Sequence, residues 1–521
     1  MLREGLPRRL VSLNLGPRRY RIPAFQVKQD KEVTMAKETG SQANKDSRAP
    51  DVFLGRRRFL AAAVGIASIP AIATEADGSG ARAPASTSPA APGRAPGTAS
   101  LAIDGGTPVR PTKLEARLPG PLYYDDEERR ELVEVLDHRS PFRWWGNDPK
   151  GRPPEKCISF EREFAAHQHA KYCVAVTSGT TALITAMAAL EVGPGDEVIL
   201  PAWTWYACYD AILAAGALPV FAEVDHSMDL DPTDVERHIS PKTKVIMAVH
   251  ILGEPADMDP ILDIARKHNL KVLEDCAQSV GVTYKGRPVG SMGDCAIYSF
   301  QVNKTISAGE GGAVMTSDPY VFERAARFHD VGTLREGHAQ VLGQAPRMNK
   351  FSGGQYRMSE FTGAVMRAQL RKLDGIVADF RDKSSRVVKG VQDLPGVQFR
   401  KRNDPEGGLG STVFIRTGNK EQRNRFIAAL KAENIPAGPM GGSVILPIEP
   451  HIERKQTLQP DWPSFSTPQG KAIQYGAAAC PRTIEIYNRY VGIPMDPRYA
   501  DQDVGDIIAA VRKVYPAVMN S

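Results

Sequence analysis

Two stretches of the sequence combine residue types that bind anions and activate amines. The run Ser178-Gly179-Thr180-Thr181 stands between a predicted buried strand, 172–176, and a predicted Ala-rich helix, 181–190. A helix start at that position directs free backbone N–H groups and the positive end of the helix dipole at an anion. Taken alone, this run is equally well explained as a good helix cap.

The second stretch supplies an acid and an amine. Asp275 directly follows the predicted strand 270–274, so it should lie at the carboxyl end of that strand, where open parallel sheets bind ligands. Lys304 lies between a predicted buried strand and the Gly-rich run 309–312. Partial burial of an amine lowers its pKa, which is the condition for a lysine that forms a Schiff base.

An anion cradle, an acid at a strand end and a lysine of this kind together indicate pyridoxal phosphate. The helix start would hold the phosphate, Asp275 would keep the pyridine nitrogen protonated, and Lys304 would bond the aldehyde carbon. An aromatic side chain is also required to stack on the ring, and Trp203, Trp205 and Tyr206 are the candidates.

The elements that position these residues alternate regularly. Predicted strands at 172–176, 197–200, 218–223, 243–249 and 270–274 are separated by predicted helices, among them 160–169, 206–215 and 259–268. Short apolar strands alternating with helices indicate an α/β fold with a mostly parallel sheet covered on both faces. Beyond about residue 370 the apolar segments are more widely spaced. Apolar segments at 396–399 and 411–417, with predicted helices at 421–433 and 501–514, indicate a smaller α+β domain.

Composition and charge exclude several other classes. The 521 residues are 42% hydrophobic and 24% charged, which is ordinary for globular proteins. The net charge of +6 comes from the first 58 residues, so the rest of the chain is close to neutral and does not favour binding to nucleic acid. The six cysteines show no C-x-x-C pair or zinc spacing, which predicts buried free thiols and no metal site.

The first hundred residues have the composition of a leader and a linker. Arg56-Arg57-Arg58-Phe59-Leu60 precedes the apolar run 61–73, which is too short to cross a bilayer but suits a signal segment that ends at a small-x-small cleavage site. This pattern resembles a twin-arginine export signal and predicts a periplasmic protein, with Met35 as an alternative start. We therefore predict a leader at 1–73, a flexible linker at 74–100, a large domain at 101–370 and a small domain at 371–521.

The body also resembles the DegT-type sugar aminotransferases of pyridoxal-phosphate fold type I. The matching motifs include Ser178-Gly179-Thr180, Pro201-x-x-Thr204-Trp205, Glu274-Asp275-x-Ala277-Gln278 and Ser299-Phe300-x-x-x-Lys304. The resemblance implies a fold with a seven-stranded sheet and a homodimer with shared active sites. It also implies transfer of an amino group from a Glu- or Gln-like donor to a keto sugar or keto-cyclitol.

The resemblance assigns roles residue by residue. Lys304 is implied to form the internal aldimine and to carry the proton, and Asp275 to pair with the pyridinium nitrogen. Contacts with the cofactor are implied for Ser178, Gly179, Thr180 and Ser299 at the phosphate, Gln278 at the ring hydroxyl, Trp205 at the ring face, and Gln355 from the neighbouring subunit.

Two positions depart from the family pattern and keep other interpretations open. Gln301 replaces the usual His, and Gln355 replaces the usual Asn. One alternative is a pyridoxamine-dependent sugar dehydratase, although such enzymes have His in place of Lys304. Another is an exported binding or regulatory relative that has lost turnover.

Overall fold

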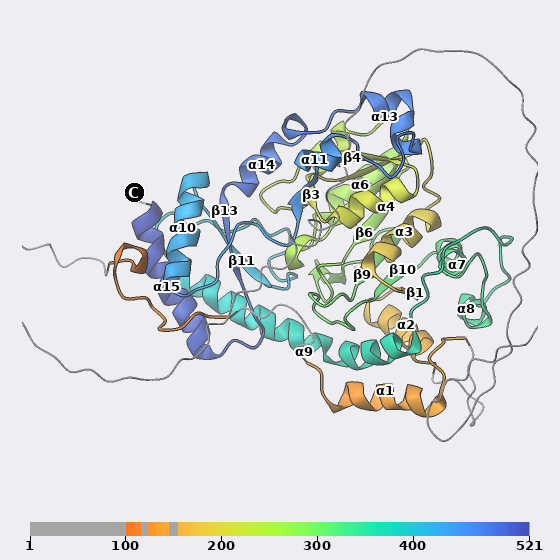
Figure 1. Ribbon diagram of the computed structural model, residues 1–521, viewed down its shortest axis with the longest axis horizontal. Coiled ribbons are helices and arrows are strands. Elements are labelled where there is room, and N and C mark those ends of the chain that lie inside the picture. Colours follow the sequence, from red (N-terminus) through yellow and green to blue (C-terminus); the bar gives the residue numbers. More distant parts are fainter. Residues whose placement is uncertain (1–99, 116–122, 145–154, 520–521) are drawn as a thin grey trace, which may run out of the picture. The chain divides into compact units, whose positions relative to one another are not determined.

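The computed structural model describes residues 100–115, 123–144 and 155–519 (Figure 1). These residues belong to a compact unit that spans 92–521. The predicted leader 1–73 and nearly all of the predicted linker lie outside the described residues. None of the helices in the described part is long and apolar enough to cross a membrane.

A seven-stranded sheet forms the centre of the unit and has the order β1-β10-β9-β6-β5-β2-β4. β10 runs antiparallel to both of its neighbours, and the other six strands point the same way. The strands are β1 Tyr172–Val176, β2 Glu197–Pro201, β4 Leu218–Ala222, β5 Thr243–Val249, β6 Lys271–Asp275, β9 Cys295–Ser299 and β10 Gly312–Thr316. This sheet confirms the predicted α/β class, and the predicted strands match to within one residue at each end.

Helices cover both faces of the sheet because its strands are apolar on both sides. Along β5, Val245 and Met247 belong to one buried cluster, whereas Ile246 and Ala248 belong to another. One face packs against α3 Gly179–Ala189, α4 Tyr206–Ala214 and α7 Pro319–Phe328, and the other against α2 Lys156–His167, α5 Pro232–Arg237 and α6 Met258–His268.

The longest helix, α9 Glu360–Val391, was not predicted from the sequence. One part of α9 packs against α2 beside the large sheet, and another part packs against α15 Asp501–Met519 (Figure 1). The domain boundary predicted between residues 370 and 371 falls inside this unbroken helix. The helix is shared by the two groups of elements, and the division into two domains stays a prediction.

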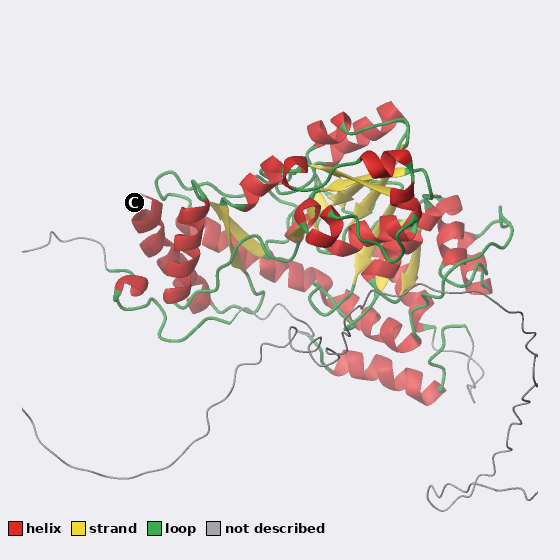
Figure 2. Cartoon of the chain, turned by 45° about the horizontal axis from the view of Figure 1, so that its top comes forward, coloured by secondary structure: helices red, strands yellow, loops and turns green. Residues whose placement is uncertain are grey.

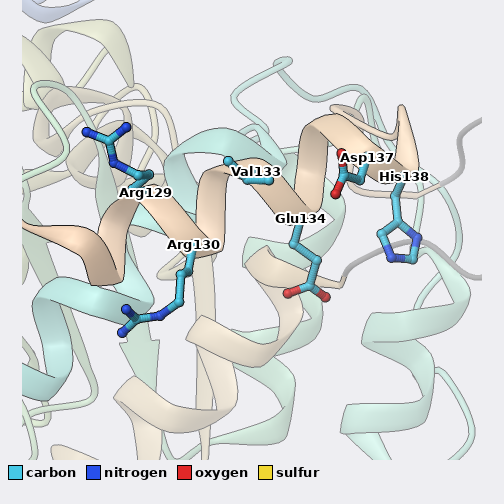
Figure 3. A pocket seen from close by; sticks show the side chains of 6 residues that line it. All are labelled: Arg129, Arg130, Val133, Glu134, Asp137 and His138. Carbon is cyan, nitrogen blue, oxygen red and sulfur yellow. The ribbon is translucent and has the colours of Figure 1, made fainter.

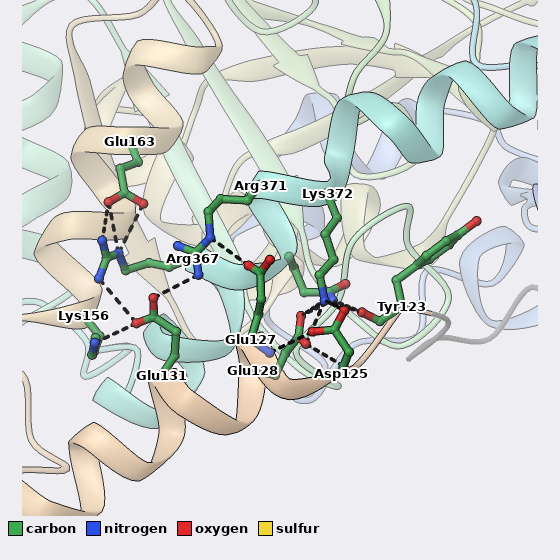
Figure 4. A network of polar contacts seen from close by, with 11 residues as sticks. Tyr123, Asp125, Glu127, Glu128, Glu131, Lys156, Glu163, Arg367, Arg371 and Lys372 are labelled. Carbon is green, nitrogen blue, oxygen red and sulfur yellow. Dashed lines mark hydrogen bonds and ion pairs between the residues drawn. The ribbon is translucent and has the colours of Figure 1, made fainter.

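α1 Asp126–His138 lies against α9 through a network of ion pairs (Figure 4). The buried ammonium of Lys156 is 2.6 Å from Glu131 and 2.5 Å from Glu134, and Arg371 binds Glu127 and Glu131. A hollow of about 320 Å³ lies along α1 and is lined by Arg129, Arg130, Val133, Glu134, Asp137 and His138 (Figure 3).

A second, smaller group of elements follows α9 (Figure 2). β11 Thr412–Arg416 pairs antiparallel with β13 Tyr490–Pro494, and α10 Lys420–Ala432 packs on α15. Within the apolar segment 396–399, Phe399 makes an isolated bridge to Ile415.

Shorter elements complete the described part. They are the strands β3 Trp203–Thr204, β7 Thr283–Tyr284, β8 Arg287–Pro288 and β12 Val444–Ile445, and the helices α8 Glu336–Leu342, α11 Pro450–Glu453, α12 Pro463–Ser466, α13 Pro468–Ala472 and α14 Pro481–Tyr487. All six cysteines are buried and free, as predicted.

Candidate active site

The site is built at the carboxyl edge of the central sheet. β1, β6 and β9 point the same way, so their ends meet at one edge. Ser178 follows β1, Asp275 is the last residue of β6, and Ser299 is the last residue of β9. Lys304 lies in the turn that follows β9, so the fold brings the predicted acid, amine and anion-binding residues to one place.

The start of α3 has the form of an anion cradle. Ser178 caps the helix with its hydroxyl, which accepts the N–H of Thr181 at 3.1 Å. The backbone N–H groups of Gly179 and Thr180 have no acceptor within residues 100–115, 123–144 and 155–519. The absence of a side chain at Gly179 matters here, because a Cβ would lie 2.7 Å from the Cβ of Ser299 and 2.9 Å from its hydroxyl oxygen. The cradle therefore requires glycine beside Ser299.

The buried carboxylate of Asp275 is held by two donors. Its Oδ1 accepts the N–H of Ala277 at 2.9 Å, and its Oδ2 accepts the thiol of Cys208 at 3.1 Å. Burial raises the pKa of Cys208 well above its usual range, so the thiol keeps its proton and donates it. The sequence predicted Cys208 only as a buried thiol, because its contact with Asp275 spans 67 residues.

The Lys304 side chain is partly buried, and its amine has no hydrogen-bond partner in the described part of the chain. Burial lowers the pKa of Lys304, while the charge of Asp275 acts in the opposite direction. A larger fraction of neutral amine follows, which is the nucleophilic form.

The two predicted ring contacts come from different elements. Trp205 directly precedes α4 and is 51% exposed, whereas Trp203, two residues earlier, is fully buried. Gln278 follows Asp275 by three residues, and its amide bonds the N–H of Leu252 at 3.1 Å and the hydroxyl of Ser443 at 3.2 Å. An exposed indole and a fixed amide thus lie on segments that adjoin the sheet edge.

Gln355 lies beside the end of β1. Its side chain is exposed and lines a hollow of about 300 Å³ together with Phe142, Thr177 and Arg357. The N–H of Thr177 donates to the carbonyl of Tyr356 at 3.0 Å, which places this segment next to the cradle. Gln301, the other departure from the family pattern, accepts the N–H of Asn303 at 2.9 Å with its side chain.

A buried cluster that the sequence did not predict lies behind β1. Arg143 donates to Glu161 at 2.7 Å, and the ring of His338 is 3.1 Å from the same carboxylate. Burial alone would raise the pKa of Glu161, but Arg143 and His338 lower it to about 2. Burial, with the charges of His338 and Arg143, lowers the pKa of His329 to about 3.

His250, Glu274 and Cys276 form the one trio of metal-ligand types that lie close together among the described residues. The Nδ1 of His250 accepts the N–H of Ala256, and its Nε2 is 3.0 Å from Glu274. Glu274 also accepts the backbone N–H groups of residues 290, 292 and 293. These bonds fix the end of β6 next to Asp275.

Comparison with known proteins agrees with this architecture. Residues 144–460 match the model of the DegT/DnrJ/EryC1/StrS aminotransferase family, and the chain belongs to that family. It is therefore an aminotransferase by family.

Two curated relatives and one solved structure are representative. The chain is 32% identical over 396 residues to the spore coat polysaccharide biosynthesis protein SpsC of Bacillus subtilis (strain 168), which covers 74% of this chain and 94% of that protein. It is 42% identical over 296 residues to GDP-perosamine synthase of Caulobacter vibrioides, covering 54% and 75%. The crystal structure of 3-amino-5-hydroxybenzoic acid synthase matches with a TM-score of 0.64 and 30% identity, covering 78% of this chain and 100% of that one.

Proposed function

We propose that this protein is a pyridoxal-phosphate-dependent aminotransferase that moves an amino group from a Glu- or Gln-like donor to a keto sugar or keto-cyclitol. The observation that carries the proposal is the partly buried Lys304 amine at the same sheet edge as Asp275 and the Gly179–Ser299 cradle. Names of the relatives support the acceptor class, since one is a GDP-perosamine synthase and another acts in polysaccharide biosynthesis.

The residues present fit the cofactor. The free amides of Gly179 and Thr180 and the hydroxyl of Ser299 would bind the phosphate, Asp275 would bind the ring nitrogen, and the exposed Trp205 would cover a ring face. Bound pyridoxal phosphate supplies the electron sink that amino transfer requires.

The chain's own residues then account for binding and proton transfer. Asp275, held by Cys208 and Ala277, keeps a negative charge fixed at the end of β6. The charge of Asp275 raises the pKa of Lys304, but burial of the amine lowers it by more, so the pKa lies below its usual range. The lowered pKa makes the Lys304 amine a better acceptor and donor of protons than a fully solvated lysine.

A half-reaction assay tests the proposal. The absorbance of protein-bound pyridoxal phosphate is followed while glutamate, glutamine, other amino acids and amino sugars are added singly. We expect an amino donor to bleach the visible band, and Lys304→Ala to remove both the band and the response. Lys285→Ala is the matched control, because Lys285 is an exposed lysine that pairs with Asp259. A visible band that no donor bleaches would instead support the alternative that this protein is a binding or regulatory relative that has lost turnover.

We further propose that two copies share their active sites, with Gln355 reaching the phosphate bound by the other copy. Support comes from the family resemblance, which implies this contact, and from the exposed side chain of Gln355, which a second copy could approach. Sedimentation of the apo and holo forms over a concentration series tests this proposal, since a ligand that binds only the dimer stabilises it by mass action.

We also propose export by the twin-arginine route to the periplasm, based on the Arg56-Arg57 pair and the apolar run 61–73. Replacing both arginines with lysine should leave the protein in the cytoplasm of a host with this route. Fractionation that finds the double variant outside the cytoplasm would contradict the proposal.

A further inference from the structure

The side-chain amide of Gln278 is held from two sides by segments that are remote in sequence. The N–H of Leu252 donates to Oε1 at 3.1 Å, and Nε2 donates to the hydroxyl of Ser443 at 3.2 Å. A backbone N–H can only donate, so the amide oxygen must face Leu252 and the NH₂ group must face away from it. The second hydrogen of Nε2 has no acceptor among the described residues.

Leu252 makes its contact from an unusual backbone conformation. Its φ of 52° and ψ of 40° lie in the left-handed region, which is unfavourable for a branched side chain. Surrounding bonds retain this conformation: the hydroxyl of Ser411 donates to the Leu252 carbonyl at 3.1 Å, and the N–H of Leu409 donates to the Gly253 carbonyl at 2.6 Å. The Leu252 N–H is therefore fixed in the direction of Gln278.

Ser443 reaches Gln278 from the opposite side. Its own hydroxyl hydrogen goes to the carbonyl of Gly442 at 2.8 Å, which leaves the oxygen lone pairs to accept from Gln278. The next residue, Val444, pairs with Thr204 in the β12–β3 ladder, directly before the exposed Trp205. The segment 442–445 thus contacts Gln278 through Ser443 and pairs with strand β3, which ends directly before Trp205.

We propose that Ser443 is a positioning residue, which together with Leu252 aims the remaining N–H of Gln278 at the ring hydroxyl of pyridoxal phosphate. This inference rests on the proposed function, because it requires the cofactor at this sheet edge. Segment 442–445 would then orient Gln278 without its own side chains touching the cofactor.

The test compares two ligands that differ only at the ring hydroxyl. Dissociation constants are measured by equilibrium dialysis for pyridoxal phosphate and for its 3-deoxy analogue, on wild type, Ser443→Ala, Ser443→Thr and Gln278→Ala. Ser443→Ala should weaken binding of pyridoxal phosphate about three- to tenfold, the loss expected for one oriented hydrogen bond, and leave the analogue unchanged. Ser443→Thr keeps the hydroxyl and should retain the preference, whereas Gln278→Ala should abolish it.

A matched control is Ser466→Ala, which removes an exposed hydroxyl that donates to the carbonyl of Pro463. Equal weakening of both ligands by Ser443→Ala, or of neither, would overturn the inference while leaving the proposed function intact. A wild-type protein that fails to bind pyridoxal phosphate would overturn both.

Discussion

Replacing Gly179 with alanine tests the anion cradle by filling it. The new Cβ would lie 2.7 Å from the Cβ of Ser299, about 1 Å closer than carbon atoms normally approach. The backbone of Gly179 is not in the left-handed region, so alanine meets no torsional obstacle there. Any effect must therefore come from the contact with Ser299.

The magnitude follows from two opposing terms. Alanine improves helix propensity over glycine by up to about 1 kcal/mol, whereas overpacking of this kind costs about 1–3 kcal/mol. We expect the free energy of unfolding of the apoprotein to fall by at most about 3 kcal/mol. Displacing Ser299 or the Gly179 amide would also remove a hydrogen bond to a charged phosphate, so the affinity for pyridoxal phosphate should fall about tenfold to a hundredfold.

Denaturant unfolding and equilibrium dialysis measure the two effects separately. In a Ser299→Gly background the clash is absent, so Gly179→Ala should no longer lower stability, although affinity should stay low because the hydroxyl is missing. Gly193→Ala is the control, since a Cβ at Gly193 would meet nothing within 4 Å. Wild-type affinity in Gly179→Ala would refute the assignment of the cradle.

Three further predictions concern other parts of the structure. Asp275→Asn should lower turnover by about two to three orders of magnitude, because an amide cannot keep the ring nitrogen protonated, and steady-state kinetics measures the loss. His329 is buried and neutral in the folded protein, with a pKa of about 3, whereas in the unfolded chain its pKa is about 6.5. As pH falls below about 6.5 the unfolded chain therefore binds a proton that the folded protein does not, and stability is lost. Between pH 7.5 and 5 the free energy of unfolding, measured in urea, should therefore fall by about 2 kcal/mol more in the wild type than in His329→Asn. Parallel curves of unfolding free energy against pH for the two proteins would contradict this. Gln355→Ala should weaken cofactor binding by about 1.5–3 kcal/mol and make the holo form dissociate on dilution, whereas a fully active holo monomer would refute the shared site.

Local patterns were sufficient to predict five of the seven strands with their bounds and to place Asp275 at the carboxyl edge of the sheet. Short apolar strands such as 172–176 and 243–249 are bounded by turn residues, and their parallel direction places Asp275 at an edge. Helix α9 was missed because glycines interrupt its pattern. The structure explains two of them: a Cβ at Gly363 would lie 2.7 Å from the backbone of Cys157, and one at Gly390 would lie 2.6 Å from Ile508.

The residues that orient the site could not be predicted, because their contacts are distant in sequence. Cys208 meets Asp275 across 67 residues, and Ser443 meets Gln278 across 165. A single sequence gives no signal for such pairs, since each residue taken alone is an ordinary buried thiol or loop serine. These pairs form only when the chain folds and brings the distant segments together.

The central claim, that Lys304 carries the cofactor at this sheet edge, is tested most directly by locating the covalent bond. Protein loaded with pyridoxal phosphate is reduced with borohydride, digested, and analysed by mass spectrometry. We predict that the mass of the reduced cofactor is found on the peptide that contains Lys304 and is lost in Lys304→Ala but not in Lys285→Ala. Cofactor on another lysine in the wild type, or no added mass after loading, would contradict the account.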